Sequence, residues 1–473
     1  MAIDPLFTCL IPGYTIDYRN VNKLNERQLK LLNEKPSYLF FRLSVPSVIG
    51  MLVFGFYQFI DGVFVGQIVG PAGMGAVGIV YPFSLLNNGI SGLIGAGAAS
   101  IVSRAIGQGD NDVLERIFPA VLLLNLIICA AVTAVSMIYT PEIVVFMGGS
   151  GEMFDFGVDY MRIVIAGTFF INFAVSINML IRSEGMIRNA MIILGTGAVL
   201  NVILDPILML VLDMGIRGAA AATVISQIVC MIMSLAHLSG KKSLIKVNFK
   251  FSKLDWEFIG RILKIGFSSL ALPVMAIVEI VTAFKLLSIY ATPNDAIALS
   301  TIFKIFSLLL PPVWGIASGM QPFVGVNYGA GKRDRVLKGY WLFTVYATVF
   351  TLIFWSALVF APKTVTGWFI TDKSMLDLIF HAPRIFFFLY PLYGFMFNTL
   401  VLLQATGEAG KAAVFVTCRM LLFFVPPMLI ICPYFGAIGV WLANPIADGL
   451  TSLGSAVALA GFLRRLSRSE AAV

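Results

Sequence analysis

Charged side chains are scarce in this chain of 473 residues, where Asp, Glu, Lys and Arg together make up only 12% of the sequence. Soluble proteins carry about 25% charged residues, so this chain has too few polar side chains to cover a water-facing surface of its size. The scarcity excludes a soluble enzyme, a nucleic-acid-binding protein and a disordered scaffold. Hydrophobic residues make up 59% of the chain, which is enough for on the order of 12 membrane spans of about 20–25 residues each.

Histidine and cysteine are also rare. The chain has two histidines, His237 and His381, and five cysteines that include no CxxC pair. Zinc sites and disulfide frameworks require closely spaced ligands or paired cysteines, so we predict neither. The sequence also lacks an HExxH motif and a recognisable nucleophile–base arrangement. We therefore predict that the protein is not an enzyme and needs no cofactor.

The apolar residues form long, continuous runs. Only helices and closed barrels satisfy their backbone polar groups in lipid, and barrel strands are alternating segments of about 10 residues. The runs therefore predict an all-α integral membrane protein. The twelve expected transmembrane helices cover residues 44–67, 74–100, 117–139, 160–181, 190–212, 218–238, 265–290, 296–324, 340–361, 379–404, 412–432 and 437–462.

Positive charges gather in alternate connections between these spans. The N-terminal segment, the even-numbered connections and the C-terminal tail hold 25 of the 33 Lys and Arg residues, whereas the opposite connections hold three. Because positively charged connections stay in the cytoplasm, we predict that both termini are cytoplasmic. The first 35 residues are polar and do not resemble a cleavable signal peptide. We expect a multi-pass protein of a bacterial or archaeal plasma (inner) membrane.

The second half of the chain repeats the first at an offset of about 222 residues. The Gly-x-Gly turn at 107–109 corresponds to the one at 329–331, and Gly185 corresponds to Gly407. No strand is expected before either turn, so we predict tight turns with positive φ and not phosphate-binding loops. Six spans per half give parallel repeats, an architecture of secondary transporters. The expected parts are an N-terminal segment 1–38, an N-lobe 39–238, a basic linker 239–264, a C-lobe 265–463 and a tail 464–473.

Two aspartates lie inside predicted spans, where a carboxylate is costly and usually marks an ion or substrate path. They are Asp61 in the first span and Asp205 in the fifth. Asn201 and Asp205 are four residues apart and share one helix face. Pro206 has no N–H to offer the Val202 carbonyl, so we expect a kink there. Such oxygen atoms suit a hard cation, and the carboxylates can also carry protons. The alternative is that Asp205 only satisfies a neighbouring Asn or Thr.

The second half does not repeat this acidic pair. The positions equivalent to Asn201 and Asp205 are Phe423 and Pro427. We therefore predict an ion site in the first half alone.

The second half has ionisable residues of its own, Glu279 and Lys285 in the seventh span and Lys304 in the eighth. Glu279 and Lys285 are six residues apart, on different helix faces, so an intrahelical pair is not expected. Either they face a water-filled cleft or they pair with other spans. Near the first-half site, Tyr57 and Gln58 are candidate cleft residues. Phe169 and Phe170 are further candidates, because aromatic rings bind flat lipophilic cations by stacking and cation–π contact.

These features together resemble the multidrug and toxic compound extrusion (MATE) family, most closely its prokaryotic DinF-like branch. The resemblance runs from about residue 38 to 462. It rests on Asp61 with Phe64-Val65-Gly66, Gly97 with Ser103-Arg104 and Gly107-Gln108-Gly109, Arg182-Ser183-Glu184-Gly185, Asn201-Val202-Ile203-Leu204-Asp205-Pro206, and Gln321-Pro322 with Asn327-Tyr328-Gly329-Ala330-Gly331.

The resemblance implies two six-helix lobes that form a V-shaped cleft. It implies an antiporter that exports amphipathic, often cationic small molecules in exchange for H+ or Na+. We expect a monomer embedded in the lipid bilayer. The family's first-lobe cation site transfers onto Asp61, Asn201, Asp205 and a sixth-span threonine, Thr223, with Na+ as the metal ion. Lys285 is a departure, because relatives usually carry Asn there.

A rival interpretation is a lipid-intermediate flippase or polysaccharide exporter of the related superfamily. Those proteins tend to have a strongly basic cleft or extra spans, whereas the site predicted here is acidic. The sequence contains no catalytic motif that would indicate a membrane enzyme. A channel does not need paired lobes with an acidic cluster in only one of them.

Overall fold

The structure is a computed structural model that describes residues 10–11, 14–15, 26–241, 243–251, 255–367 and 381–470. The described residues are almost entirely helical, with one antiparallel pair of two-residue strands near the N-terminus, β1 (Leu10–Ile11) and β2 (Tyr14–Thr15). Eleven of the described helices are long and apolar enough to cross a membrane. The prediction of an all-α membrane protein is confirmed.

The first half forms the N-lobe. A short helix, α1 (Glu26–Asn33), precedes it and packs on the C-lobe helix α10. The helices of the N-lobe are α2 (Pro36–Ile68), α3 (Pro71–Gln108), α4 (Asn111–Ile138), α5 (Thr140–Phe146), α6 (Glu152–Ser183), α7 (Ile187–Pro206) with its π-helical continuation η2 (Ile207–Val211), and α8 (Gly215–Ser239).

The second half forms the C-lobe. Its described helices are α9 (Trp256–Tyr290), α10 (Pro293–Gly329), α11 (Arg333–Phe360), α12 (Pro362–Gly367), α14 (His381–Phe386), η5 (Tyr390–Leu392), α15 (Tyr393–Ala405), α16 (Ala409–Cys418), η6 (Arg419–Phe424), α17 (Val425–Phe435) and α18 (Ala437–Glu470).

The tenth predicted span, 379–404, is not one continuous helix. Its first two residues lie outside the described residues, and the remainder divides into α14, the 3-10 turn η5 and α15. Pro391 lies at this break and has no N–H for a helical hydrogen bond, so the chain turns through i→i+3 bonds such as Leu392 N–H to the Leu389 carbonyl at 2.9 Å. The prediction of a single helix over this span was wrong for that reason.

Several helices extend beyond the predicted spans. Helix α9 begins at Trp256, inside the segment expected to be a linker, because the Asp255 side chain caps it by accepting from the Phe258 N–H at 2.5 Å. The glycines of the two Gly-x-Gly motifs do form tight turns, with φ of 71° at Gly109 and 73° at Gly331.

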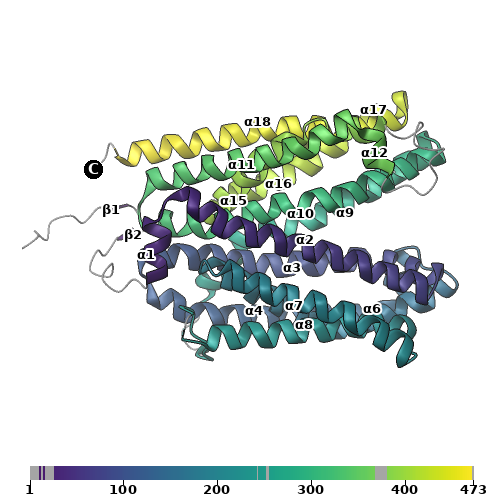
Figure 1. Ribbon diagram of the computed structural model, residues 1–473, viewed down its shortest axis with the longest axis horizontal. Coiled ribbons are helices and arrows are strands. Elements are labelled where there is room, and N and C mark those ends of the chain that lie inside the picture. The colour runs from purple at the N-terminus through teal and green to yellow at the C-terminus, as the bar shows by residue number, and fades with distance from the viewer. Residues whose placement is uncertain are drawn as a thin grey trace, which may run out of the picture.

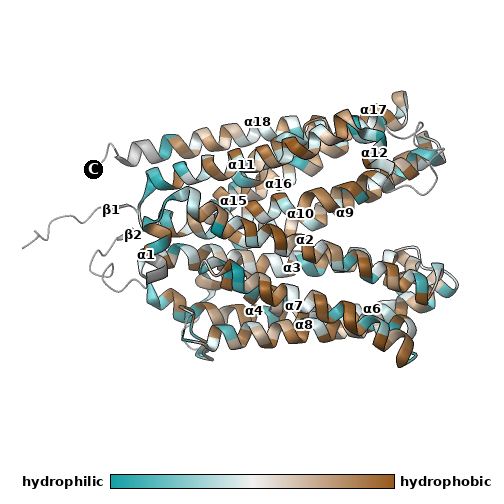
Figure 2. Ribbon diagram, in the orientation of Figure 1, coloured by the Kyte–Doolittle hydropathy of each residue, from teal (hydrophilic) through white to brown (hydrophobic). Residues whose placement is uncertain are grey.

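The two halves lie side by side as separate groups of helices, and α1 and the end of α18 lie at the same end of the molecule (Figure 1). Hydrophobic residues dominate the middle of both groups, and hydrophilic residues collect towards the ends of the helices (Figure 2). This distribution is the one expected of a bundle whose sides face lipid.

The lobes meet closely in the half of the molecule nearest α1. A Cβ added at Gly266 of α9 would lie closer than 3.0 Å to the Leu93 backbone of α3, and one at Gly329 of α10 would lie equally close to the Arg104 backbone. Farther from α1, a Cβ at Gly62 of α2 or Gly78 of α3 would meet no atom within 4 Å. Glycine therefore lets the lobes approach closely in the half of the molecule nearest α1.

Candidate functional site

The four residues of the predicted cation site come together in the N-lobe. Asp61 lies on α2, Asn201 and Asp205 on α7, and Thr223 on α8. Asp205 is fully buried and Asn201 is 1% exposed. We call these four residues the N-lobe cluster.

Hydrogen bonds link α7 to α8 within the cluster. The Asn201 Nδ2 atom donates to Asp205 Oδ1 at 3.3 Å and lies 3.4 Å from Thr223 Oγ1. The Asp61 side chain of α2 and the Asp205 side chain of α7 lie close enough to interact electrostatically. Two ionised carboxylates this close repel each other, so this arrangement needs a proton or a cation between them.

Three oxygen atoms of the N-lobe cluster are buried without a hydrogen-bond partner in the described structure. They are Asp61 Oδ1, Asn201 Oδ1 and Asp205 Oδ2. A buried polar atom without a partner costs about 1–3 kcal/mol. Hard cations take oxygen ligands of this kind, and two carboxylates suit a monovalent ion or a shared proton. The cluster thus fits Na+ or H+ through its donor set.

The backbone next to the cluster departs from regular α-helix. Helix α7 ends at Pro206 and continues as the π-helical turn η2. Short π-helical segments are frequent at functional sites. A Cβ added at Gly218 of α8 would lie closer than 3.0 Å to the backbone of Leu208 and Met209. Helix α8 therefore packs tightly against this turn.

Tyr160 of α6 was missed by the sequence interpretation. Tyr160 is 7% exposed and lies near Thr223 and Asp61. It lies at the start of the predicted fourth span, where a tyrosine is usually an interfacial residue. Only the packing of α6 on α8 identifies it as a neighbour of the cluster.

The predicted cleft residues do not form one group. Gln58 is exposed and Tyr57 is half-buried, with its ring 5.1 Å from that of Phe54. Phe169 stacks on Phe173 at 5.3 Å inside the N-lobe core. Their role in cargo binding stays a prediction.

Glu279 of α9 pairs with another helix and not with Lys285. Glu279 Oε2 lies 4.0 Å from Arg419 Nη1 of η6. Arg419 also donates to Asp448 Oδ1 of α18, from Nη2 at 2.8 Å and from Nε at 3.2 Å. Lys285 is exposed. Of the two alternatives for Glu279, pairing with another span is the one the structure has.

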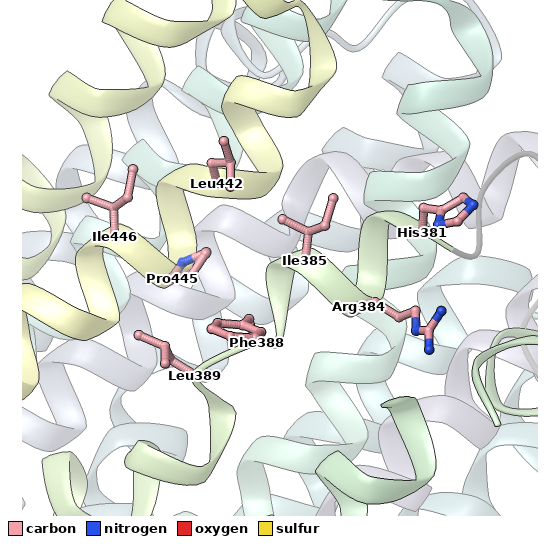
Figure 3. A pocket seen from close by; sticks show the side chains of 8 residues that line it. All are labelled: His381, Arg384, Ile385, Phe388, Leu389, Leu442, Pro445 and Ile446. Carbon is pink, nitrogen blue, oxygen red and sulfur yellow. The ribbon is translucent and has the colours of Figure 1, made fainter. Parts of the chain in front are cut away.

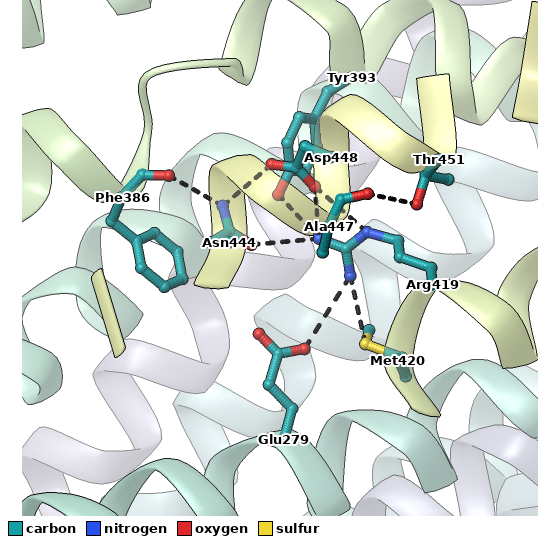
Figure 4. Close-up of polar contacts among 9 residues, drawn as sticks. All are labelled: Glu279, Phe386, Tyr393, Arg419, Met420, Asn444, Ala447, Asp448 and Thr451. Atoms are coloured by element: carbon teal, nitrogen blue, oxygen red, sulfur yellow. Dashed lines mark hydrogen bonds and ion pairs between the residues drawn. The ribbon is translucent and has the colours of Figure 1, made fainter. Parts of the chain in front are cut away.

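Polar side chains complete the surroundings of Arg419. Its Nη2 donates to the Tyr393 hydroxyl and to Asn444 Oδ1, each at 3.2 Å. Asn444 Nδ2 in turn donates to Asp448 Oδ2 at 3.0 Å and to the Phe386 carbonyl at 2.8 Å. We call the set of Glu279, Tyr393, Arg419, Asn444 and Asp448 the C-lobe cluster (Figure 4).

An open pocket of about 630 Å³ lies elsewhere in the C-lobe, between α14 and α18. Figure 3 shows Ile385 and Phe388 of α14 and its following turn opposite Leu442 and Ile446 of α18. Its lining includes no residue of either cluster and no predicted cleft residue. The pocket is therefore separate from both clusters.

The comparisons with known proteins agree with this architecture. The family model MatE matches the chain twice, at residues 46–207 and 269–430, once in each lobe. Together the two matches cover more than half of the chain. A duplicated helical membrane bundle with a buried polar cluster is the pattern of a transporter, and the chain belongs to the MatE family, whose members are transporters and not enzymes. The predictions of a MATE protein and of a non-enzyme are confirmed.

Two curated relatives span nearly the whole chain. The multidrug export protein MepA of Staphylococcus aureus is 23% identical over 438 residues, which cover 91% of this chain and 95% of MepA. The FAD transporter of Shewanella oneidensis is 24% identical over 430 residues, which cover 89% of this chain and 94% of that transporter.

Among solved structures, the fold is similar to the outward-facing conformation of a multidrug resistance MATE family transporter of the MOP superfamily. The TM-score is 0.84 at 24% sequence identity, over 94% of this chain and 99% of the other. The likeness establishes the two-lobe fold.

Proposed function

We propose that the protein is a secondary active antiporter that exports amphipathic, cationic small molecules in exchange for Na+ or H+. The observation that carries this proposal is the N-lobe cluster, in which two carboxyl groups lie close together and three buried oxygen atoms have no hydrogen-bond partner among the described residues. The drug-export function of the relative MepA supports the nature of the cargo.

The N-lobe cluster provides a way to couple ion binding to helix position. A bound Na+ or a shared proton would remove the repulsion between Asp61 and Asp205 and draw α2 towards α7. Helix α2 also contacts the other lobe, where Val48 and Ser44 lie against Gly315 and Gly319 of α10. Movement of α2 would therefore change the contact between the lobes, and coupling requires only that ion and cargo favour different arrangements.

The arrangement of the lobes fits one state of an alternating-access cycle. The closest approaches between the lobes lie near α1, and the far halves of α2 and α3 include positions with open space. If both termini are cytoplasmic, as the charge distribution indicates, this state faces outward. The proposed protein is a monomer of the plasma membrane, with the division into lobes and linker predicted from the sequence.

A second candidate function is export of an anionic aromatic compound. Lys285 and Lys304 are exposed and pair with no other group in the described part of the chain. Lys304 precedes Gly315 by three helical turns, which places it on the face of α10 that meets the N-lobe. The relative that is an FAD transporter makes phosphate-bearing cargo a specific alternative.

Efflux from proteoliposomes tests both functions. Vesicles loaded with ethidium, a lipophilic aromatic cation, receive either a pH gradient or a sodium gradient. We expect one of the two gradients to drive ethidium efflux. Asp61→Asn should reduce the efflux rate to that of ethidium-loaded liposomes without protein. The matched control is Asp159→Asn, which removes a partly exposed carboxylate that pairs with Arg217 at 3.0 Å. Equal efflux by wild type and Asp61→Asn would contradict the proposal.

The same vesicles loaded with FAD test the second candidate. Two results together would favour the anionic cargo. The wild type would export no ethidium, and FAD efflux would be slower in a Lys285→Gln/Lys304→Gln variant than in wild type. Ethidium efflux that is unchanged in this double variant would favour the cationic cargo.

A further inference from the structure

The C-lobe cluster occupies the helices that correspond to those of the N-lobe cluster. At the offset of about 222 residues, α2 corresponds to α9, α7 to α16 with η6, and α8 to α18. Glu279 and Arg419 lie four residues before the positions equivalent to Asp61 and Asn201, and Asp448 lies three residues after the position equivalent to Thr223. Each displacement is about one helical turn. Both clusters thus join three corresponding helices of their own half, and Tyr393 of α15 adds a fourth element to the C-lobe cluster.

The two clusters also share most of their chemical groups. Each has two carboxyl groups, one asparagine amide and one hydroxyl group. The difference is Arg419, whose guanidinium lies between Asp448 and Glu279. The described residues of the N-lobe cluster include no such cation.

Hydrogen bonding follows this difference. The C-lobe cluster has none of its side-chain atoms among the buried atoms that lack a partner in the described structure, whereas the N-lobe cluster has three. The guanidinium is always charged and provides five N–H donors. It donates to Asp448 Oδ1 and Asn444 Oδ1 and forms an ion pair with Glu279. In the N-lobe cluster, the corresponding oxygen atoms are left for an external ion.

We propose that Arg419 is a tethered cation that permanently occupies the C-lobe counterpart of the ion site. The C-lobe then takes up no ion during transport, and only the N-lobe exchanges one. Removal of Arg419 exposes a latent site for a monovalent cation, Na+ or free guanidinium. The consequence for ion exchange rests on the proposed antiport function, but the latent site does not.

Chemical rescue of stability tests the latent site without any transport. The unfolding temperature of the full-length protein in detergent is measured in the presence of millimolar sodium chloride, guanidinium chloride or choline chloride. We expect Arg419→Ala to lower the unfolding temperature by about 5–10 °C, because it leaves two buried carboxylates unpaired. Guanidinium or sodium should restore at least half of the loss, and choline, which is too large, should not.

Arg384→Ala is the matched control, because Arg384 is another C-lobe arginine whose Nη2 donates to a carbonyl, that of Val359, at 2.6 Å. Its unfolding temperature should not respond specifically to sodium or guanidinium. An Arg419→Ala protein that loses no stability, or that no cation restores, would overturn the proposal.

If Arg419→Ala does not fold, a neutral pair keeps the proposal testable. Arg419→Met with Asp448→Asn should be more stable than Arg419→Met alone, because the second change removes the uncompensated charge. A double variant no more stable than the single one refutes the role of Arg419 as a counter-ion.

Binding of radioactive sodium gives an independent readout of the same site. Asp61→Asn should bind little sodium, and Asp61→Asn/Arg419→Ala should regain one sodium ion per chain. This gain does not depend on whether the wild type couples transport to sodium. A failure of the proposed antiport function is therefore distinguishable from a failure of the tethered-cation proposal. No gain in the double variant, together with no rescue by guanidinium, would contradict the tethered cation.

Discussion

The N-lobe cluster and the C-lobe cluster are built on corresponding helices but differ in how their charges are balanced. In the N-lobe, Asp61 and Asp205 lie close together and buried oxygen atoms lack partners within the described structure. In the C-lobe, Arg419 supplies the balancing charge from the chain itself. The difference shows how a duplicated fold keeps a polar position while changing what fills it.

Burial makes this difference consequential. An ion pair that is taken out of water is strongly dependent on both partners, so the C-lobe cluster should hold η6 and α18 together in every state. A pair of like charges is stable only with a bound proton or cation. The N-lobe cluster is therefore the one that can respond to ion concentration.

The largest expected effect comes from breaking the C-lobe cluster. Asp448→Ala leaves Arg419 buried with its main partner removed and should lower the free energy of unfolding by about 3–5 kcal/mol. Thermal or denaturant unfolding in detergent measures this loss. A decrease below about 1 kcal/mol would show that the cluster is balanced in another way.

Neutralising the N-lobe cluster should affect ion response more than stability. With wild type, we expect the coupling ion to raise the free energy of unfolding by about 1–3 kcal/mol near saturation. Asp205→Asn should abolish both that increase and the coupled efflux. Only the Asp61 carboxylate then remains, so there is no repulsion between two carboxylates for a bound ion to relieve. Unfolding curves recorded over a sodium series and over a pH series measure the response. An ion response retained by Asp205→Asn would place the coupling site elsewhere.

Transfer of the tethered cation to the other half sharpens the comparison. Asn201→Arg places a guanidinium beside Asp205 and Asp61, as Arg419 lies beside Asp448. We expect a folded protein whose unfolding temperature no longer depends on sodium or pH, and whose efflux is lost. Asn201→Gln is the control for size, and it should keep part of the ion response. Ion-dependent efflux by Asn201→Arg would argue against the comparison.

The smallest effect is expected for a charge pair outside both clusters. Arg217 and Asp159 form an exposed pair with N···O distances of 3.0 and 3.1 Å. Because exposed pairs contribute about 0–1 kcal/mol, Arg217→Ala should change stability little and leave efflux intact. A loss similar to that of Asp448→Ala would mean that burial does not distinguish these pairs.

Much of the N-lobe cluster was predictable because charges are rare in the spans. Asp61 and Asp205 stand out against apolar neighbours, and the four-residue spacing of Asn201 and Asp205 indicates one helix face. Thr223 entered only through the family resemblance. Tyr160 was not predicted, since a tyrosine near the end of a span gives no signal of its own.

The C-lobe cluster was much less predictable. Glu279, Arg419 and Asp448 come from three helices that are distant in sequence, and spacing within one helix cannot pair them. A buried charge needs a partner, so the presence of opposite charges in three spans was the available signal. It does not say which charge meets which.

The sequence by itself determined the class of protein, its helices and its duplication, because hydropathy and repeated glycine turns are local properties of the chain. The tertiary structure alone decided which polar groups meet, where α14 and α15 separate, and at which end the lobes touch. These depend on how helices pack against one another. The balance of charge in each cluster is thus a property of contacts between helices, and the amino-acid order specifies it only through the fold.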